Sequence, residues 1–167
     1  MKRLLVTGLT MMLSACWHIE GSGVLKEESR SVGGFSKVSV SGGLKAEVAS
    51  GAEVSVVVSG DDNIVAVIQT EVSGSTLNVQ PEPGVSFNES QPLVVRVTLP
   101  AIEEIEVSGA SHVAARGISA RRLSIEASGA SHVCAAGWAE ELELEASGAS
   151  QIHAGDLASH VARADAS

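Results

Sequence analysis

The sequence is poor in aromatic residues, in cysteines and in basic residues. Aromatics make up 2% of the 167 residues and Tyr is absent, so a core must come from Val, Ile, Leu and Ala. Long runs of Leu, Glu and Lys at a helical period are missing, which argues against a helical bundle. The net charge is −9 and no RNA-binding aromatic motif occurs, so we expect no nucleic-acid partner. Small and β-branched residues favour an all-β protein.

Residues 1–15 have the pattern of a signal sequence rather than of a folded segment. Two basic residues are followed by a mostly apolar run at residues 4–13. This run is too short to cross a bilayer, which takes roughly 20 residues. The segment LSAC at residues 13–16 resembles a lipoprotein lipobox, which implies cleavage before Cys16 and a lipid on its sulfur and new amine.

Lipidation of Cys16 predicts the compartment of the protein. Several acyl chains give stable anchoring, so we expect an exported protein held at a membrane through Cys16. Trp17 follows, not the Asp that similar lipoproteins use for inner-membrane retention, which favours the outer membrane, on its periplasmic or surface face. Residues 16–31 are polar and contain glycine, and they predict a tether to a head domain over residues 32–167.

A repeat beginning at about residue 101 is the most informative feature of the chain. The segments IEVSGAS (105–111), IEASGAS (125–131) and LEASGAS (144–150) are near copies in which apolar and polar residues alternate. This pattern predicts a right-handed parallel β-helix, a solenoid with turns of about 20 residues, after an irregular β-rich N-terminal half. An antiparallel meander or sandwich of short strands is the alternative.

The last repeat stops short of a fourth SGAS motif, because the chain ends at Ser167. We interpret this as a truncation, since solenoids need capping terminal repeats. An uncovered strand edge then predicts self-association through the C-terminal turn.

Several motifs resemble those of one known family. They are GGF (33–35), SGDDN (59–63), the strand 92–100 that ends in TLP, and the SGAS repeats. Together, from roughly Val32 onward, they resemble the putative auto-transporter adhesin, head GIN domain family. The resemblance implies a β-helical exported protein, often a lipoprotein, with no established activity.

The repeat register predicts one outward ladder of carboxylates. Its members are Glu106, Glu126, Glu145 and Asp165. Like charges on facing strands repel, and either a weakly bound cation such as Ca²⁺ or simple solvation would relieve this. Glu126 and Glu145 are also the candidate acid/base pair of a polysaccharide-acting β-helix enzyme. Trp138, Arg121 and Arg122 are the only nearby residues that could assist such a reaction.

A second ladder combines histidine and cysteine. In the predicted register His132, Cys134 and His153 share one face, and two imidazoles and a thiolate are plausible zinc or copper ligands. Surface histidines inherited from the repeat are the alternative. Cys134 has no disulfide partner if Cys16 is lipidated.

The leading hypothesis is a lipid-anchored envelope protein that is not an enzyme and needs no cofactor. Its β-solenoid face would serve adhesion to an extended partner such as a polysaccharide or another envelope protein. The rival functions are the enzyme that uses Glu126 and Glu145 and the metal-binding protein that uses His132, Cys134 and His153. The sequence names no ligand.

Overall fold

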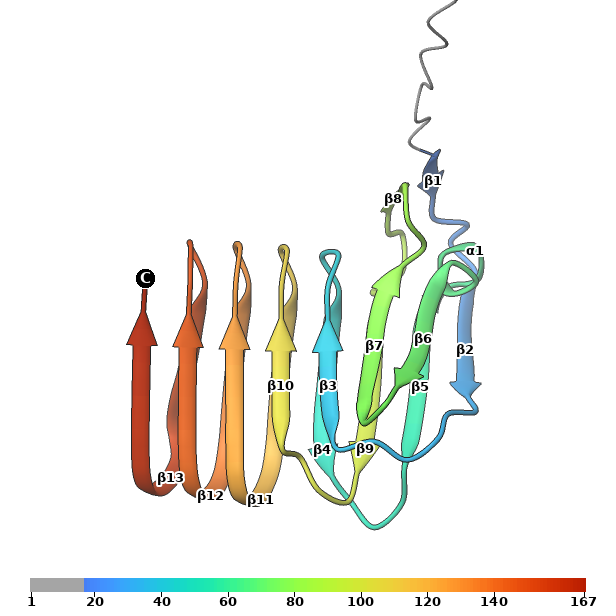
Figure 1. Cartoon of the computed structure of the whole chain (residues 1–167). Coiled ribbons are helices and arrows are strands. Elements are labelled where there is room, and N and C mark those ends of the chain that lie inside the picture. Colours follow the sequence, from blue (N-terminus) through green and yellow to red (C-terminus); the bar gives the residue numbers. More distant parts are fainter. Residues whose placement is uncertain (1–16) are drawn as a thin grey trace, which may run out of the picture.

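The computed structural model describes residues 17–167, so the predicted signal sequence and Cys16 lie outside the described residues. Within them the chain forms strands and one short helix (Figure 1). These elements are β1 (Trp17–Glu20), β2 (Leu25–Arg30), β3 (Lys37–Val40), β4 (Lys45–Ser50), β5 (Ser55–Asp61), α1 (Asp62–Val65), β6 (Ile68–Ser73), β7 (Thr76–Pro81), β8 (Val85–Asn88), β9 (Val94–Leu99), β10 (Glu104–Val107), β11 (His112–Ala127), β12 (His132–Ala146) and β13 (Gln151–Ala166). No helix in this part of the chain is long and apolar enough to cross a membrane.

Eleven strands belong to one mixed sheet, and β1 and β8 form a separate two-stranded ribbon. The order in the large sheet is β2-β5-β9-β4-β11-β10-β3-β7-β6, with β12 and β13 added beside β11. The strands β11 to β13 each bend midway. The first part of each strand lies on one side of the molecule and the second part on the opposite side (Figure 1). The sheet thereby folds back on itself around an apolar core.

The predicted right-handed parallel β-helix is wrong, although the all-β class is confirmed. The pairs β2–β5, β5–β9 and β6–β7 are antiparallel, whereas neighbouring strands of a parallel β-helix are parallel. In addition, β10 lies between β11 and β3, and β3 is far from β10 in the chain. The result is a nearly closed, barrel-like mixed sheet. The repeat could not reveal this, because it does not extend into residues 25–99. There, short connections such as the turn at Gly74 (φ 63°) join neighbouring strands in opposite directions.

The repeated segments place equivalent residues side by side. Ile105 pairs with Ile125, and Ile125 with Leu144, each in parallel strands. Alternate side chains point inward, so Leu123 and Ile125 are fully buried.

The SGAS turns owe their shape to serine and glycine. The Ser131 hydroxyl donates to the carbonyls of Val107 (3.2 Å) and Ser128 (2.8 Å), which ties this turn to the end of β10. Gly129 has φ 73° and lies directly above the backbone of Gly109, where a Cβ would clash. A side chain at this position is therefore excluded by both backbone conformation and space.

The predicted tether differs from the structure. Within residues 17–31, β1 pairs with β8 and β2 pairs with β5. The buried Asp61 carboxylate holds this segment in place by accepting hydrogen bonds from the backbone N–H groups of Gly23 (2.7 Å), Ser90 (2.8 Å) and Gln91 (2.9 Å). Polarity suggested a loose linker, but polar groups of this segment are satisfied by strand pairing and by Asp61.

Candidate functional site

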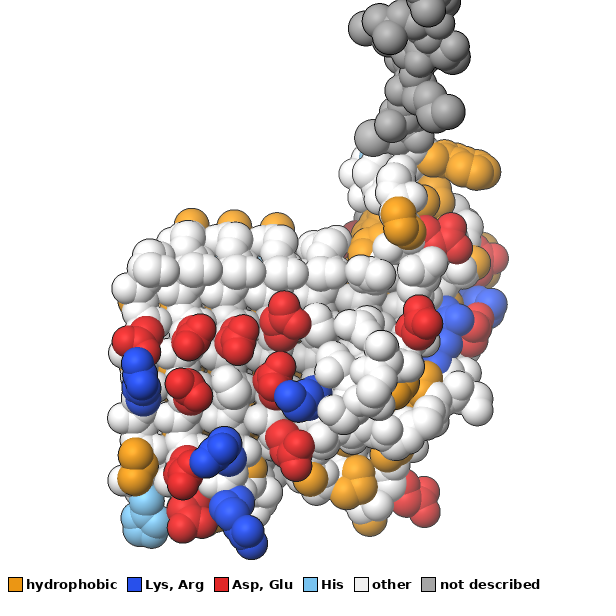
Figure 2. Space-filling view, viewed as in Figure 1, with side chains coloured by type: hydrophobic (Ala, Val, Ile, Leu, Met, Phe, Trp, Pro, Cys, Tyr) orange, Lys and Arg blue, Asp and Glu red, His pale blue; other side chains and the backbone are white. Residues whose placement is uncertain are grey.

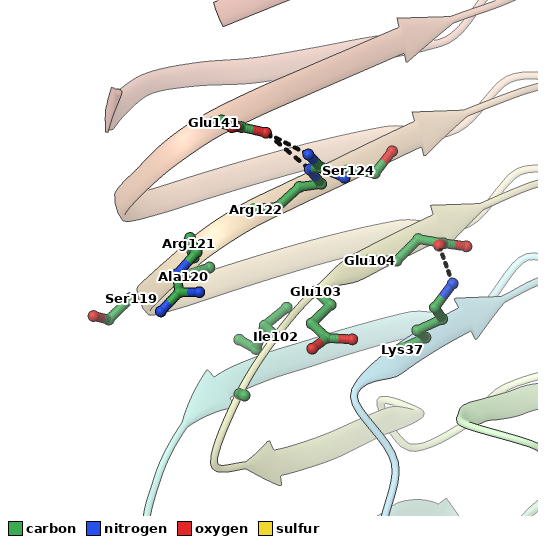
Figure 3. Close-up of a pocket in the computed structure, with 11 residues that line it drawn as sticks. Lys37, Ile102, Glu103, Glu104, Ser119, Ala120, Arg121, Arg122, Ser124 and Glu141 are labelled. Carbon is green, nitrogen blue, oxygen red and sulfur yellow. Dashed lines mark hydrogen bonds and ion pairs between the residues drawn. The ribbon is translucent and has the colours of Figure 1, made fainter. Parts of the chain in front are cut away.

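A hollow of about 580 Å³ lies where β10 joins the repeated strands (Figure 3). It forms because β10 begins only at Glu104, whereas its neighbour β11 continues through the bend. The chain before Glu104 leaves the layer, as Figure 3 shows, and space remains beside β11. Its main polar side chains are Lys37, Glu103, Glu104, Arg121, Arg122 and Glu141.

Two ion pairs border this hollow. The Lys37 Nζ atom lies 2.7 Å from Glu104 Oε2, and Arg122 Nη2 lies 2.7 Å from Glu141 Oε2. The hydrogen bond from Lys37 to the Glu104 carboxylate raises the pKa of Lys37. All four side chains are partly or largely exposed, so these pairs position charges more than they stabilise the fold.

Arg121 is different, because it forms no ion pair with any described residue of the chain. Its guanidinium group is exposed at the side of the hollow opposite Glu103. The Glu103 carboxylate accepts a hydrogen bond from the Ser36 hydroxyl (2.8 Å). The hollow thus offers a free planar donor and a fixed acceptor, which suits a ligand rich in hydroxyl groups.

Sequence reasoning missed most of this hollow. Arg121 and Arg122 were identified only as possible helpers of the acidic pair, and Lys37, Glu103 and Glu104 were not identified at all. One sequence signal is present: the acidic pair 103–104 comes shortly after Pro100, where the irregular half meets the repeat. Its proximity to Lys37 depends on the pairing of β10 with β3, which nothing in the repeat reveals.

The carboxylate ladder does lie in one row. Glu106 faces Glu126, Glu126 faces Glu145, and Glu145 faces Asp165 on successive parallel strands. Figure 2 shows this acidic row across the face of the molecule. Partial burial raises the pKa of Glu126, and the negative charges of Glu145, Glu104, Glu106 and Glu143 raise it further.

The surroundings of the ladder give little support for acid/base catalysis. A hollow of about 470 Å³ lies along the row, lined by the four carboxylates and small residues. Neither Trp138 nor the two arginines at 121–122 line it, so these candidate helpers do not lie beside the pair Glu126 and Glu145. All four carboxylates are exposed, so the pair lacks the apolar pocket that typically makes one carboxyl a general acid.

The histidine and cysteine residues are only partly brought together. Cys134 faces His153 across β12 and β13, and both line one hollow with Arg116 and Asp156. The His132 ring instead stacks on His112, with centroids 4.8 Å apart and planes inclined by 5°. Among residues 17–167, no group of three or more His, Cys, Asp or Glu side chains is arranged to hold a metal ion.

Comparison with known proteins identifies one family. Residues 34–167 match the family described as "Putative auto-transporter adhesin, head GIN domain", which confirms the resemblance seen in the motifs. No curated protein matches the chain.

Several solved structures share the fold. A putative adhesin from Bacteroides fragilis has a TM-score of 0.75 at 21% identity, covering 89% of this chain and 78% of its own. A putative lipid binding protein from Parabacteroides distasonis has a TM-score of 0.64 at 15% identity, covering 90% and 81%. A putative adhesin from Parabacteroides merdae has a TM-score of 0.64 at 15% identity, covering 89% and 80%. At these identities the likeness shows a common fold alone.

Proposed function

Because the chain belongs to the putative auto-transporter adhesin, head GIN domain family, we propose that it is an adhesin-like, non-catalytic binding protein of the bacterial cell envelope. The neighbouring structures described as adhesins agree with this role. The exposed setting of the carboxylate ladder favours binding over catalysis.

The proposal includes export and a lipid anchor on Cys16. Its support is the sequence: residues 1–15 have the pattern of a signal sequence, and LSAC matches a lipobox. Trp17 after the cysteine favours the outer membrane. Mass spectrometry of the protein purified from bacterial membranes tests this directly, because acylation adds a lipid mass to the N-terminal peptide. A Cys16→Ser variant is the control and should remain unmodified and leave the membrane fraction.

The partner we propose is an extended polysaccharide of the envelope, bound at the hollow beside β10. One observation carries this assignment: Arg121 is exposed and unpaired within the described chain, opposite the oriented Glu103 carboxylate. Sugar hydroxyls can accept from a guanidinium group and donate to a carboxylate, whereas an anionic or cationic ligand would meet one repulsive partner.

Binding of the full chain to purified envelope polysaccharides, measured by calorimetry, tests this site. Replacing Arg121 by Ala removes a charged hydrogen bond of about 1.5–3 kcal/mol, so the affinity should fall roughly tenfold or more. The control is Arg163→Ala, which removes another exposed arginine that lies outside the hollow. Equal affinities for the two variants would place the binding site elsewhere.

A further inference from the structure

The β1–β8 ribbon has one polar and one apolar face. Its parallel register pairs Trp17 with Val85 and Ile19 with Phe87, while His18 pairs with Ser86 between them. Because side chains alternate along a strand, the two apolar pairs share one face. On the other face, the His18 ring bonds the Ser86 hydroxyl at 3.0 Å.

The apolar face is buried at one end and open at the other. Ile19 and Phe87 are partly buried and pack against the core of the large sheet. The Trp17 side chain extends beyond them and is 73% exposed, next to Val85. Figure 2 shows hydrophobic side chains gathered at this end of the described chain. The exposed indole leaves apolar area in contact with water, and burial of that area in another apolar surface would be favourable.

The ribbon is fixed to the body of the protein. Gly21 donates its N–H to the Asn88 carbonyl (2.9 Å), and the Asn63 side chain donates to the Glu20 carbonyl (2.8 Å). The Ser90 hydroxyl donates to the Gly21 carbonyl (3.1 Å). These bonds hold the strand that carries Trp17, so the position of the indole is set by the fold rather than by a loose linker.

We propose that Trp17 and Val85 form a membrane-contacting foot, which inserts at the interface of the bilayer that holds the lipid on Cys16. This inference rests on the proposed lipidation, because Cys16 directly precedes Trp17 in the sequence. The acyl chains therefore enter the bilayer next to the indole. Tryptophan suits that depth, since its ring is apolar and its N–H bonds at the headgroup level.

Neighbouring charges indicate what kind of bilayer surface this foot contacts. Glu20 and Glu82 are exposed near the ribbon, so anionic headgroups would be repelled. Contact is then driven by burial of apolar area.

The foot would also orient the binding site. In Figure 1 the β1–β8 ribbon lies at one end of the molecule and the bends of β11 to β13 lie at the opposite end. Arg121 comes shortly after the β11 bend (Figure 3). With the ribbon against the bilayer, the hollow beside β10 faces away from the membrane, where a polysaccharide can reach it.

The two tryptophans of the chain allow a direct test, because Tyr is absent and the only Trp residues are Trp17 and Trp138. Trp138 is 42% exposed on β12, just after the bend. The full-length, lipidated Trp138→Phe and Trp17→Phe variants are each reconstituted into phosphatidylcholine vesicles, with or without bromine on the acyl chains. Fluorescence then reports Trp17 alone or Trp138 alone.

We expect brominated lipid to quench Trp17 emission strongly and to shift it to shorter wavelengths, while Trp138 emission stays the same in both vesicles. Unquenched Trp17 in protein that floats with the vesicles would overturn the foot while leaving the anchor intact. Protein that does not float, with no lipid on Cys16 by mass spectrometry, would instead refute the proposed anchor and with it this inference. Equal quenching of both tryptophans would show that the protein has no fixed orientation and would also overturn the proposal.

Discussion

The two halves of the large sheet differ in how their strands are ordered and what sets their register. In residues 104–166 each strand lies beside the strand one repeat away, and like residues stack on like residues. In residues 25–99 the strand order departs from the chain order, and antiparallel pairs occur. Repetition sets register by itself, because a slip would move every apolar residue to the wrong face. The irregular half relies instead on individual contacts such as those of Asp61.

A fall in pH also changes the stability of the two halves in opposite directions. Burial alone would raise the pKa of Asp61, but the hydrogen bonds from Gln91, Ser90 and Gly23 outweigh it and lower the pKa. In the repeats, burial and neighbouring carboxylates raise the pKa of Glu126. Acid therefore weakens an essential contact of the first half and relieves repulsion in the second.

The largest expected effect is loss of an apolar side chain from the stacked strands. Leu123 is fully buried and faces Leu142, which is 5% exposed and in turn faces Ala162. Leu123→Ala should lower the free energy of unfolding by about 2–5 kcal/mol, and Leu142→Ala by an amount near the lower limit. Urea denaturation followed by circular dichroism measures both. Equal losses would show that the core does not thin toward β13.

Removing the Asp61 charge tests the irregular half. An Asn at this position has one acceptor oxygen for three N–H groups, so Asp61→Asn should destabilise the protein at pH 7. The folded-state pKa of Asp61 lies below its ordinary value, so its contribution is present at neutral pH and is lost as the pH falls through that lowered pKa. The wild type should therefore approach the variant in strong acid. Asp156→Asn, an exposed change in β13, should leave denaturation curves unchanged.

Glycines at the bends test how tightly the repeats stack. Gly137 has φ 140°, and a Cβ there would collide with the backbone of Ile118. Gly137→Ala should cost about 1–3 kcal/mol. Gly155, near the bend of the next strand, has open space around it and no positive φ, so Gly155→Ala should be neutral or stabilising by about 0.4–1 kcal/mol. Thermal denaturation distinguishes the two, and similar costs would contradict the close stacking at Gly137.

The smallest effect is expected from the acidic row. Glu126→Gln removes repulsion from two facing carboxylates and should stabilise the protein at pH 7 by a few tenths to about 1 kcal/mol. Because the folded-state pKa of Glu126 is raised, its charge is destabilising at neutral pH and the penalty disappears as the pH falls below 4.5. The gain should also shrink in high salt. Glu71→Gln, an exposed change in β6, is the control and should show no such gain.

Individual residues show which features of the candidate sites could be predicted from the sequence. The spacing of Glu106, Glu126 and Glu145 predicted their facing positions, because identical motifs stack in register. The same spacing predicted that Cys134 faces His153, but not that the His132 ring stacks on His112, since that is a matter of ring orientation. The proximity of the unpaired Arg121 to Glu103 could not be predicted from the sequence, because these residues meet only where an irregular connection enters the sheet.

The sequence by itself determined the all-β class, the family and the register of the repeats, since alternation and near-identical motifs act locally or between adjacent copies. Only the tertiary structure decided the mixed sheet, the burial of Asp61 and the ordering of residues 17–31. These features depend on strands far apart in the chain, such as β3 beside β10 and β1 beside β8. No local sequence pattern indicates such pairings, because the free energy that favours them comes from packing of the whole core.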